Sequence, residues 1–206
     1  MNPSIVGVVT GRVIVLNGTT SAGKTTLAKL LQRELAARGE PWLVIGLDDF
    51  MARSPADWFR IGNHVGSHAE EGIVFETVDG AIERRVGPWG RTVLAGYRGA
   101  VAGMARAGLH VIVDEVMLSA EDWDGWQQEL TGLDVTWVAV DAALDIVLER
   151  ERERGDRVIG MAAAQYDVVH AFATYDVRVD TGTLTPTEAV GAILGAERGS
   201  ARYRRG

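Results

Sequence analysis

The amino-acid sequence predicts a three-layer α/β fold, in which a five-stranded parallel sheet lies between helices. Five short apolar segments alternate with segments whose apolar residues have helical spacing. The first strand, the first helix and the second strand together span about 35 residues, which is typical of a βαβ unit with parallel strands. A glycine-rich loop joins that first strand to its helix. The length of 206 residues fits a single domain, 1–206, with a sizeable core.

Each expected element has a local signal. Residues 13–16 are wholly apolar, which is typical of a buried strand, and Leu27, Leu31 and Leu35 recur at helical spacing in the segment that follows. The strands are expected at 13–16, 42–46, 109–113, 135–140 and 176–180. The helices are expected at 25–37, 91–107, 120–130, 142–152, 161–172 and 186–194. The basic tail, 198–206, is expected to be frayed.

The regular alternation stops between residues 51 and 90. This segment is rich in aromatic residues, and within it 73–84 has the pattern of a β-hairpin closed by an Asp79-Gly80 turn. An aromatic insert between the second and third core strands is a natural place to bind a small-molecule acceptor. For any single aromatic residue in it, a role in a solvent-facing elaboration is equally plausible. The aromatic and histidine residues are Trp58, Phe59, His64, His68 and Trp89.

The composition argues against several classes of protein. The net charge of −7 argues against a general nucleic-acid binder, because such proteins need a basic face. The absence of cysteine excludes disulfides and thiolate chemistry. No apolar run approaches the roughly 20 residues that span a bilayer, and the N-terminus lacks a signal-peptide pattern. We therefore expect a cytoplasmic protein with neither nucleic acid nor membrane as a partner. Small residues within 90–108 could form the interface of a homo-oligomer.

The glycine-rich loop is a complete G-x-x-x-x-G-K-[ST] motif between a strand and a helix. Its glycines let successive N–H groups point at one phosphate, and the helix N-terminus favours the anion. Lys24 adds positive charge for the β- and γ-phosphates of ATP, and the Thr25 hydroxyl suits Mg²⁺. A chance match in a glycine-rich turn is the alternative, which the flanking strand and helix disfavour. The expected nucleotide-binding residues of this segment are Gly18, Thr19, Thr20, Ser21, Ala22, Gly23, Lys24, Thr25 and Thr26.

Two further strands end in acidic residues, at the edge of the sheet where ligands of such folds bind. Asp114 follows a run of apolar residues and is expected to hold Mg²⁺ beside Thr25, although an Asp in this place can also cap a helix. Glu115 could contact the substrate, water or nothing. Asp48 is the candidate base for the attacking hydroxyl, and Asp49, which can instead cap a helix, is its rival because neighbouring strand side chains point in opposite directions.

Arginines are concentrated between residues 150 and 157. A guanidinium can bind phosphate oxygens and neutralise charge in a transition state, and Gly155 would let the segment 150–162 hinge as a lid. The alternative is a solvated helix face on which the arginines pair with Glu149, Glu151 and Glu153. Both descriptions hold if Arg154 and Arg157 form the working end of the segment.

Taken together, these motifs resemble the chloramphenicol phosphotransferase family. The phosphate loop is shared by a very large superfamily, whereas the run Arg154-Gly155-Asp156-Arg157-Val158 followed by 160–163 is much narrower. The other matching segments are 16–24, 46–48, 104–108, Gln165, 168–170, 175–177 and 179–181. The resemblance thins between residues 51 and 90, so the acceptor could differ from chloramphenicol.

The resemblance implies a shikimate-kinase-like arrangement and transfer of the ATP γ-phosphate to a hydroxyl of an antibiotic. It assigns the base to Asp48 in preference to Asp49, and the catalytic lid arginines to Arg154 and Arg157. It also implies that Arg150 packs on the adenine and that Thr181 lies beside it. The alternatives are a metabolite or nucleoside kinase with the same core, and a P-loop NTPase switch. A switch needs a residue that positions water, whereas a carboxylate facing an aromatic insert favours a bound alcohol.

Overall fold

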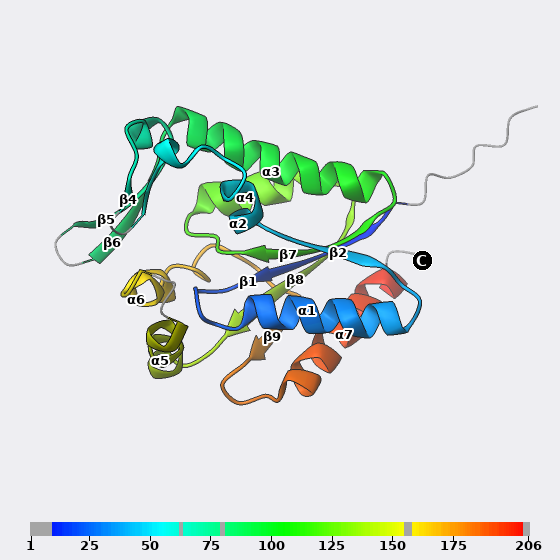
Figure 1. Ribbon diagram of the computed structural model, residues 1–206. Helices are drawn as coiled ribbons and strands as arrows, with labels where there is room; N and C mark the ends of the chain where they lie inside the picture. Colours follow the sequence, from blue (N-terminus) through cyan, green and yellow to red (C-terminus); the bar gives the residue numbers. More distant parts are fainter. Residues whose placement is uncertain (1–9, 62–63, 79–80, 155–157, 204–206) are drawn as a thin grey trace, which may run out of the picture.

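The computed structural model describes residues 10–61, 64–78, 81–154 and 158–203 (Figure 1). Its central sheet has five strands in the order β2-β7-β1-β8-β9, and every pair of neighbours is parallel. The sequence prediction of a five-stranded parallel sheet is therefore confirmed. The strands are β1 Arg12–Asn17, β2 Trp42–Gly46, β7 His110–Glu115, β8 Asp134–Asp141 and β9 Val177–Asp180.

Helices cover both faces of this sheet because successive side chains of each strand point to opposite sides. Ile14 and Leu16 of β1 pack on one side with α1 Lys24–Ala37 and α7 Pro186–Tyr203. Val13 and Val15 pack on the other side with α3 Pro88–Arg106 and α4 Ala120–Glu129 (Figure 1). Two apolar cores therefore hold β1 rigidly in the middle of the sheet. Within the described residues, no helix is long and apolar enough to cross a membrane.

The ends of two helices differ from the sequence prediction. The helix expected at 161–172 is α6 Met161–Tyr166, which is followed by a turn in which Val168 and Val169 both donate to the Gln165 carbonyl. The tail was expected to be frayed from residue 198, but α7 continues to Tyr203. Its last turns contain no proline, and before them Glu197 makes an ion pair with Arg12 of β1. The first helix therefore ends early in a local turn, and the second continues because no proline breaks it.

The insert forms a second, smaller sheet with the order β4-β3-β5-β6. β5 Ile73–Val78 and β6 Ala81–Val86 are antiparallel, as the hairpin prediction requires, whereas the expected turn at Asp79-Gly80 lies outside the described residues. The short strands β3 Phe59–Ile61 and β4 His64–Val65 and the 3₁₀ turns at Ala56–Trp58 and Ala69–Glu71 were not expected. The aromatic residues mainly pack on one another: Trp89 contacts both Trp58 and Phe59.

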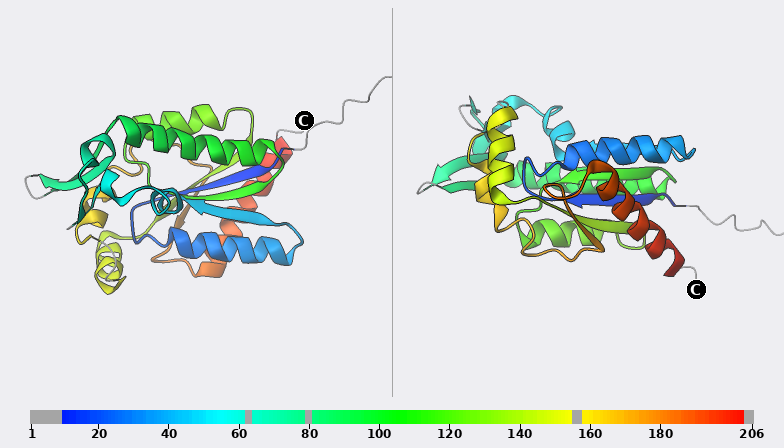
Figure 2. Two further views of the ribbon diagram at one scale, coloured as in Figure 1. Left: turned by 45° about the horizontal axis from the view of Figure 1, so that its top comes forward. Right: turned by 90° about the horizontal axis from the view of Figure 1, so that it is seen from below.

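The insert and the segment after β8 meet beyond the carboxyl edge of the sheet. α5 Leu144–Arg154 leads through residues outside the described ranges to α6, and α6 lies against β6 (Figure 2). Ile82 of β6 lies 3.6 Å from where a Cβ on Gly160 would be. The strands therefore open onto a space between the insert on one side and α5 and α6 on the other.

Candidate active site

The phosphate loop leaves β1 and ends at the first residue of α1. Gly18 packs so closely on β8 that a Cβ there would lie 2.2 Å from the Val140 carbonyl oxygen. Gly23 has a φ of +92°, a left-handed conformation that favours glycine. The Lys24 ammonium is buried and donates to the Thr19 carbonyl over 2.9 Å. Both glycines of the motif are thus required by the backbone, and the loop curls around the lysine.

Thr25 and Asp114 are in direct contact. The Thr25 hydroxyl donates to Oδ2 of Asp114 over 2.5 Å, and Lys24 Nζ lies 3.9 Å from Oδ1 of the same carboxylate. Leu16 of β1 pairs with Asp114 of β7, and this register brings Asp114 close to Thr25, which follows β1 across the phosphate loop. A hydroxyl and a carboxylate are the hard oxygen ligands that Mg²⁺ prefers. Among the described residues, no group of three or more His, Cys, Asp or Glu side chains is placed to hold a metal ion.

A cavity of about 410 Å³ lies on one side of the phosphate loop. Arg150 of α5 donates to the Thr181 hydroxyl over 2.9 Å and to the Thr181 carbonyl over 3.0 Å. The Thr181 hydroxyl in turn donates to the Ala22 carbonyl of the loop over 2.8 Å. The two residues expected beside the adenine are therefore joined to each other and to the phosphate loop. Arg150 and Thr181 both line this cavity, together with Leu184 and Pro186.

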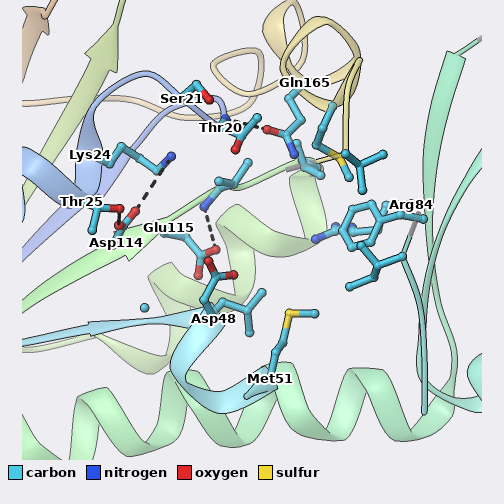
Figure 3. Close-up of a pocket in the computed structure, with 18 of the residues that line it drawn as sticks. Thr20, Ser21, Lys24, Thr25, Asp48, Met51, Arg84, Asp114, Glu115 and Gln165 are labelled. Carbon is cyan, nitrogen blue, oxygen red and sulfur yellow. Dashed lines mark hydrogen bonds and ion pairs between the residues drawn. The ribbon is translucent and has the colours of Figure 1, made fainter. Parts of the chain in front are cut away.

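A second cavity of about 240 Å³ lies on the other side of the loop (Figure 3). Lys24, Thr25, Asp48, Asp114 and Glu115 line its polar end. The insert supplies part of its apolar wall through Met51, Ile61, Ile73 and Phe75. The tryptophans of the insert are not among its lining residues. The part of the insert that faces the candidate chemistry is thus mainly aliphatic, and the aromatic cluster supports it from behind.

Asp48 and Asp49 have different surroundings. The sequence indicated that Asp48 ends a strand, but both residues lie in the first turn of a short helix, α2 Leu47–Met51, that follows β2 directly. Asp49 Oδ2 accepts from the Gly46 backbone N–H over 2.7 Å, so Asp49 caps this helix. Asp48 lines the second cavity, whereas Asp49 does not. The two neighbouring carboxylates therefore differ in place: Asp48 lines the cavity, and Asp49 caps the helix.

The two cavities meet at the phosphate loop. Four residues line both of them: Ser21, Gly23, Thr26 and Arg154. Arg154 is the last residue of α5 and belongs to the predicted lid, whereas Arg157, its expected partner, lies outside the described residues. A molecule in one cavity would therefore contact a molecule in the other beside Arg154 and the loop backbone.

Glu115 lies on the floor of the second cavity next to Asp114. It accepts from the Trp126 indole N–H over 3.1 Å and from the Val116 backbone N–H over 2.8 Å. Burial raises its pKa to about 7, despite these two donors, because an ionised carboxylate is poorly solvated there. The structure therefore gives Glu115 a place in the cavity that the sequence left open.

Two residues that hold the predicted lid had no contact assigned to them from the sequence, although Gln165 was among the residues that carry the family resemblance. Glu151 was weighed as part of a solvated face, but it is only 1% exposed and accepts from the backbone N–H groups of Gly160 and Ala162 at the start of α6. Gln165 of α6 accepts from the Thr20 backbone N–H over 2.8 Å. These contacts join α5 to α6 and α6 to the phosphate loop. A glutamine or glutamate within a helical pattern carries no sequence signal for such a distant contact.

Comparisons with known proteins identify the family and the fold of the chain. Residues 11–197 match the family model described as chloramphenicol phosphotransferase-like protein. A Mycobacterium tuberculosis protein named "Putative O-phosphotransferase" is 34% identical over 201 residues, which cover 93% of this chain and 84% of that protein.

Two solved structures share the fold. A Mycobacterium tuberculosis APS kinase in complex with AMPPNP and APS has a TM-score of 0.64 at 16% identity, with 92% of this chain and 98% of that chain covered. A gluconokinase from Sinorhizobium meliloti has a TM-score of 0.60 at 16% identity, with 96% and 97% covered.

Proposed function

The chain belongs to the chloramphenicol phosphotransferase-like family, and we propose that it transfers the γ-phosphate of ATP to a hydroxyl of a small-molecule antibiotic or another hydroxylated natural product. The phosphotransferase family and the P-loop kinase fold are the premises of this proposal. The proposal adds three points to these premises: ATP is the phosphate donor, an alcohol is the acceptor, and particular residues act on each of them.

One observation carries the proposal: the two cavities share the phosphate loop and Arg154. Phosphoryl transfer requires the donor and the acceptor to meet in line at one phosphorus atom, and little else of the chemistry is covalent. The cavity beside Arg150 and Thr181 suits the nucleoside of ATP. The cavity beside Asp48 suits the acceptor, because it lies on the far side of the loop that would hold the γ-phosphate.

The donor side has a role for each residue. The backbone N–H groups of the loop and the Lys24 ammonium would bind the β- and γ-phosphates. Thr25 and Asp114 would hold Mg²⁺, which supplies charge neutralisation to the phosphates when it is bound. Arg154, together with Arg157, would neutralise the charge that develops on the transferred phosphoryl group. The predicted lid would carry both arginines.

On the acceptor side, Asp48 would act as the base. The hydroxyl oxygen forms a bond to the γ-phosphorus while the bond from that phosphorus to the β,γ-bridging oxygen breaks. The bond electrons leave with ADP, and the hydroxyl proton passes to the Asp48 carboxylate and then to water. A carboxylate suits this step because it needs only to orient the hydroxyl and accept its proton as charge develops.

The apolar wall of the insert favours an apolar natural product over a sugar or a nucleoside. Met51, Ile61, Ile73 and Phe75 offer no hydrogen-bonding side chain, so Arg84 is the one hydrogen-bonding side chain among the described insert residues that line the cavity. A sugar would bring several hydroxyl groups that need partners. An antibiotic with an apolar body and an accessible hydroxyl could pack on the apolar wall and also place its hydroxyl beside Asp48. Phosphorylation would add a dianionic group to that hydroxyl and thereby confer resistance if the drug target has no room for the charge.

A panel assay tests the proposal. The protein is incubated with ATP, Mg²⁺ and hydroxylated antibiotics, metabolites and nucleosides, and each compound is examined by mass spectrometry for the gain of one phosphoryl group. We expect such a gain for an apolar antibiotic-like alcohol and none with Lys24→Ala. Phosphorylation of sugars or nucleosides alone would overturn the choice of acceptor, and phosphorylation of no alcohol would overturn the proposal.

A further inference from the structure

Arg84 of β6 is a cationic side chain on the insert side of the acceptor cavity. Figure 3 shows it extending from the strand toward the middle of the cavity, while Lys24, Asp48 and Asp114 lie at the opposite end. Two other basic residues line this cavity, and both adjoin the phosphates: Lys24 belongs to the loop and Arg154 lies at the junction with the nucleotide side. An acceptor whose hydroxyl lies beside Asp48 would therefore place its remote end beside Arg84.

The guanidinium of Arg84 is held in place before any ligand binds. Its Nη2 donates to Asp122 Oδ2 over 2.5 Å, and both side chains are largely buried, with 13% and 9% exposed. Asp122 is itself fixed, because the same oxygen accepts from the Leu118 backbone N–H, and the Asp122 backbone N–H donates to the Ser119 hydroxyl. A donor that is already ordered loses little conformational entropy when it binds.

Arg84 has donors to spare. A guanidinium carries five N–H groups, and Asp122 engages Nη2. Nε and Nη1 make no hydrogen bond with another group in the described part of the chain, although Arg84 lines the cavity. Phe75, Leu118 and Met161 line the same cavity, and their apolar side chains cannot accept these N–H groups. An acceptor molecule with an oxygen at this point would replace water on the guanidinium.

The charges around the cavity favour an uncharged oxygen. Asp122 already compensates the charge of Arg84, and Asp48 and Asp114 add negative charge at the other end. A carboxylate on the acceptor would meet no uncompensated cation beside Arg84 and would be repelled from the acidic end. A carbonyl oxygen accepts from the guanidinium without this penalty.

We propose that Arg84 is a specificity-determining residue, which binds a carbonyl or similar uncharged oxygen at the end of the acceptor remote from the phosphorylated hydroxyl. This inference rests on the proposed function, since it takes the cavity beside Asp48 as the acceptor site. The substrate class that it defines has a hydroxyl at one end, an apolar body, and a neutral hydrogen-bond-accepting oxygen at the other end.

Three matched alcohols test the inference by binding alone, without ATP. They are 3-arylpropan-1-ols whose rings carry a para acetyl, a para ethyl or a para carboxylate group, and their affinities are measured by isothermal titration. We expect the acetyl compound to bind about tenfold more tightly than the ethyl compound, because one hydrogen bond to a charged donor is gained. Arg84→Met should abolish this difference.

Two further variants guard against misfolding and nonspecific effects. Arg84→Met leaves Asp122 unpaired, so Arg84→Met combined with Asp122→Asn is measured as well; the asparagine retains an acceptor for the Leu118 N–H. Arg85→Met is the matched control, because Arg85 follows on the same strand but pairs with Glu70 and Glu76 outside the cavity. It should retain the preference for the acetyl compound.

The outcomes separate this inference from the proposed function. Equal binding of the acetyl and ethyl compounds, no binding of either, or a preference that survives in both Arg84 variants would overturn the role of Arg84. Tightest binding of the carboxylate would overturn the choice of an uncharged oxygen. Transfer of phosphate is measured separately on the same compounds. Binding that depends on Arg84 without any transfer would contradict the kinase proposal and still support a ligand site at Arg84.

Discussion

The Thr25 hydroxyl and the Asp114 carboxylate contact each other across a 2.5 Å hydrogen bond, although they lie on α1 and β7. Adjacent parallel strands bring their carboxyl ends to one edge, so a residue after β1 and a residue near the end of β7 become neighbours. These are the two side chains that we assign to Mg²⁺.

We predict that Asp114→Asn raises the Mg²⁺ concentration needed for half-maximal transfer by about tenfold or more. The amide keeps the shape of the side chain and can still accept from Thr25, but it lacks the charge that attracts a cation. Initial rates over a Mg²⁺ series at saturating ATP measure the change. Asp124→Asn, on the exposed side of α4, is the control and should leave the Mg²⁺ dependence as it is. An unaltered dependence for Asp114→Asn would remove Asp114 from the metal site.

Asp48→Asn should lower the rate constant of transfer by about 10²–10⁴-fold, the range expected for loss of a general base. ATP affinity should hardly change, because Asp48 lies in the cavity on the acceptor side. Asp49→Asn is the matched comparison, since its amide can still accept from the Gly46 N–H and cap α2. Single-turnover transfer and equilibrium ATP binding are measured for both variants. Loss of transfer in Asp49→Asn alone would assign the base to Asp49.

Gln165→Ala should raise the KM for ATP and lower the thermal stability. The change leaves the buried Thr20 N–H without its acceptor, which costs about 1–3 kcal/mol, and it releases α6 from the phosphate loop. Gln165→Glu retains an oxygen in the same place and should restore most of the affinity for ATP. Steady-state kinetics with ATP varied, together with thermal melts, check both effects. A normal KM in Gln165→Ala would show that the loop does not depend on α6.

Glu115 should make the metal-free protein less stable as the pH rises from about 4.5 to about 7. Its pKa is raised to about 7 in the folded state, so the folded protein holds a proton that the unfolded chain has released, and the free energy of unfolding falls across this window. The loss amounts to at most about 3 kcal/mol. This loss is measured by urea unfolding of the wild-type protein and of Glu115→Gln over a pH series, with a chelator present in both cases.

The Glu115→Gln variant should gain stability relative to wild type between pH 5 and pH 8, because it has no carboxyl group to ionise. Shifts at other groups are common to both proteins and cancel in this difference. A constant difference in stability between the two proteins at all pH values would contradict the raised pKa.

The sequence predicted the central sheet and the phosphate loop well, because both depend on local signals. Buried parallel strands are continuous apolar runs, and the loop needs its glycines at fixed spacing. The same local signals explain why β5 and β6 were found. The strands β3 and β4 are only three and two residues long, which is too short for a period to be detected.

Contacts between distant segments were the part that the sequence did not reveal. The Arg84–Asp122 pair joins residues 38 positions apart, and Gln165 binds Thr20 across 145 positions. Glu151 looked like one of several solvated acids on a charged helix, yet it is buried because α6 folds back over it. Asp48 was expected at a strand end, but it lies in the one turn of α2, whose first turn is capped by the neighbouring Asp49 carboxylate.

The ratio of phosphorylated alcohol to ADP tests directly whether the protein transfers the γ-phosphate of ATP to an alcohol. Each alcohol of the panel is mixed in turn with ATP and Mg²⁺, and ³¹P NMR follows ADP, the phosphate ester and free phosphate together. For the alcohol that is the acceptor, we predict one molecule of phosphate ester for each ADP, with little free phosphate. Formation of ADP and free phosphate without any ester would contradict it and would indicate an NTPase whose product is a conformational change.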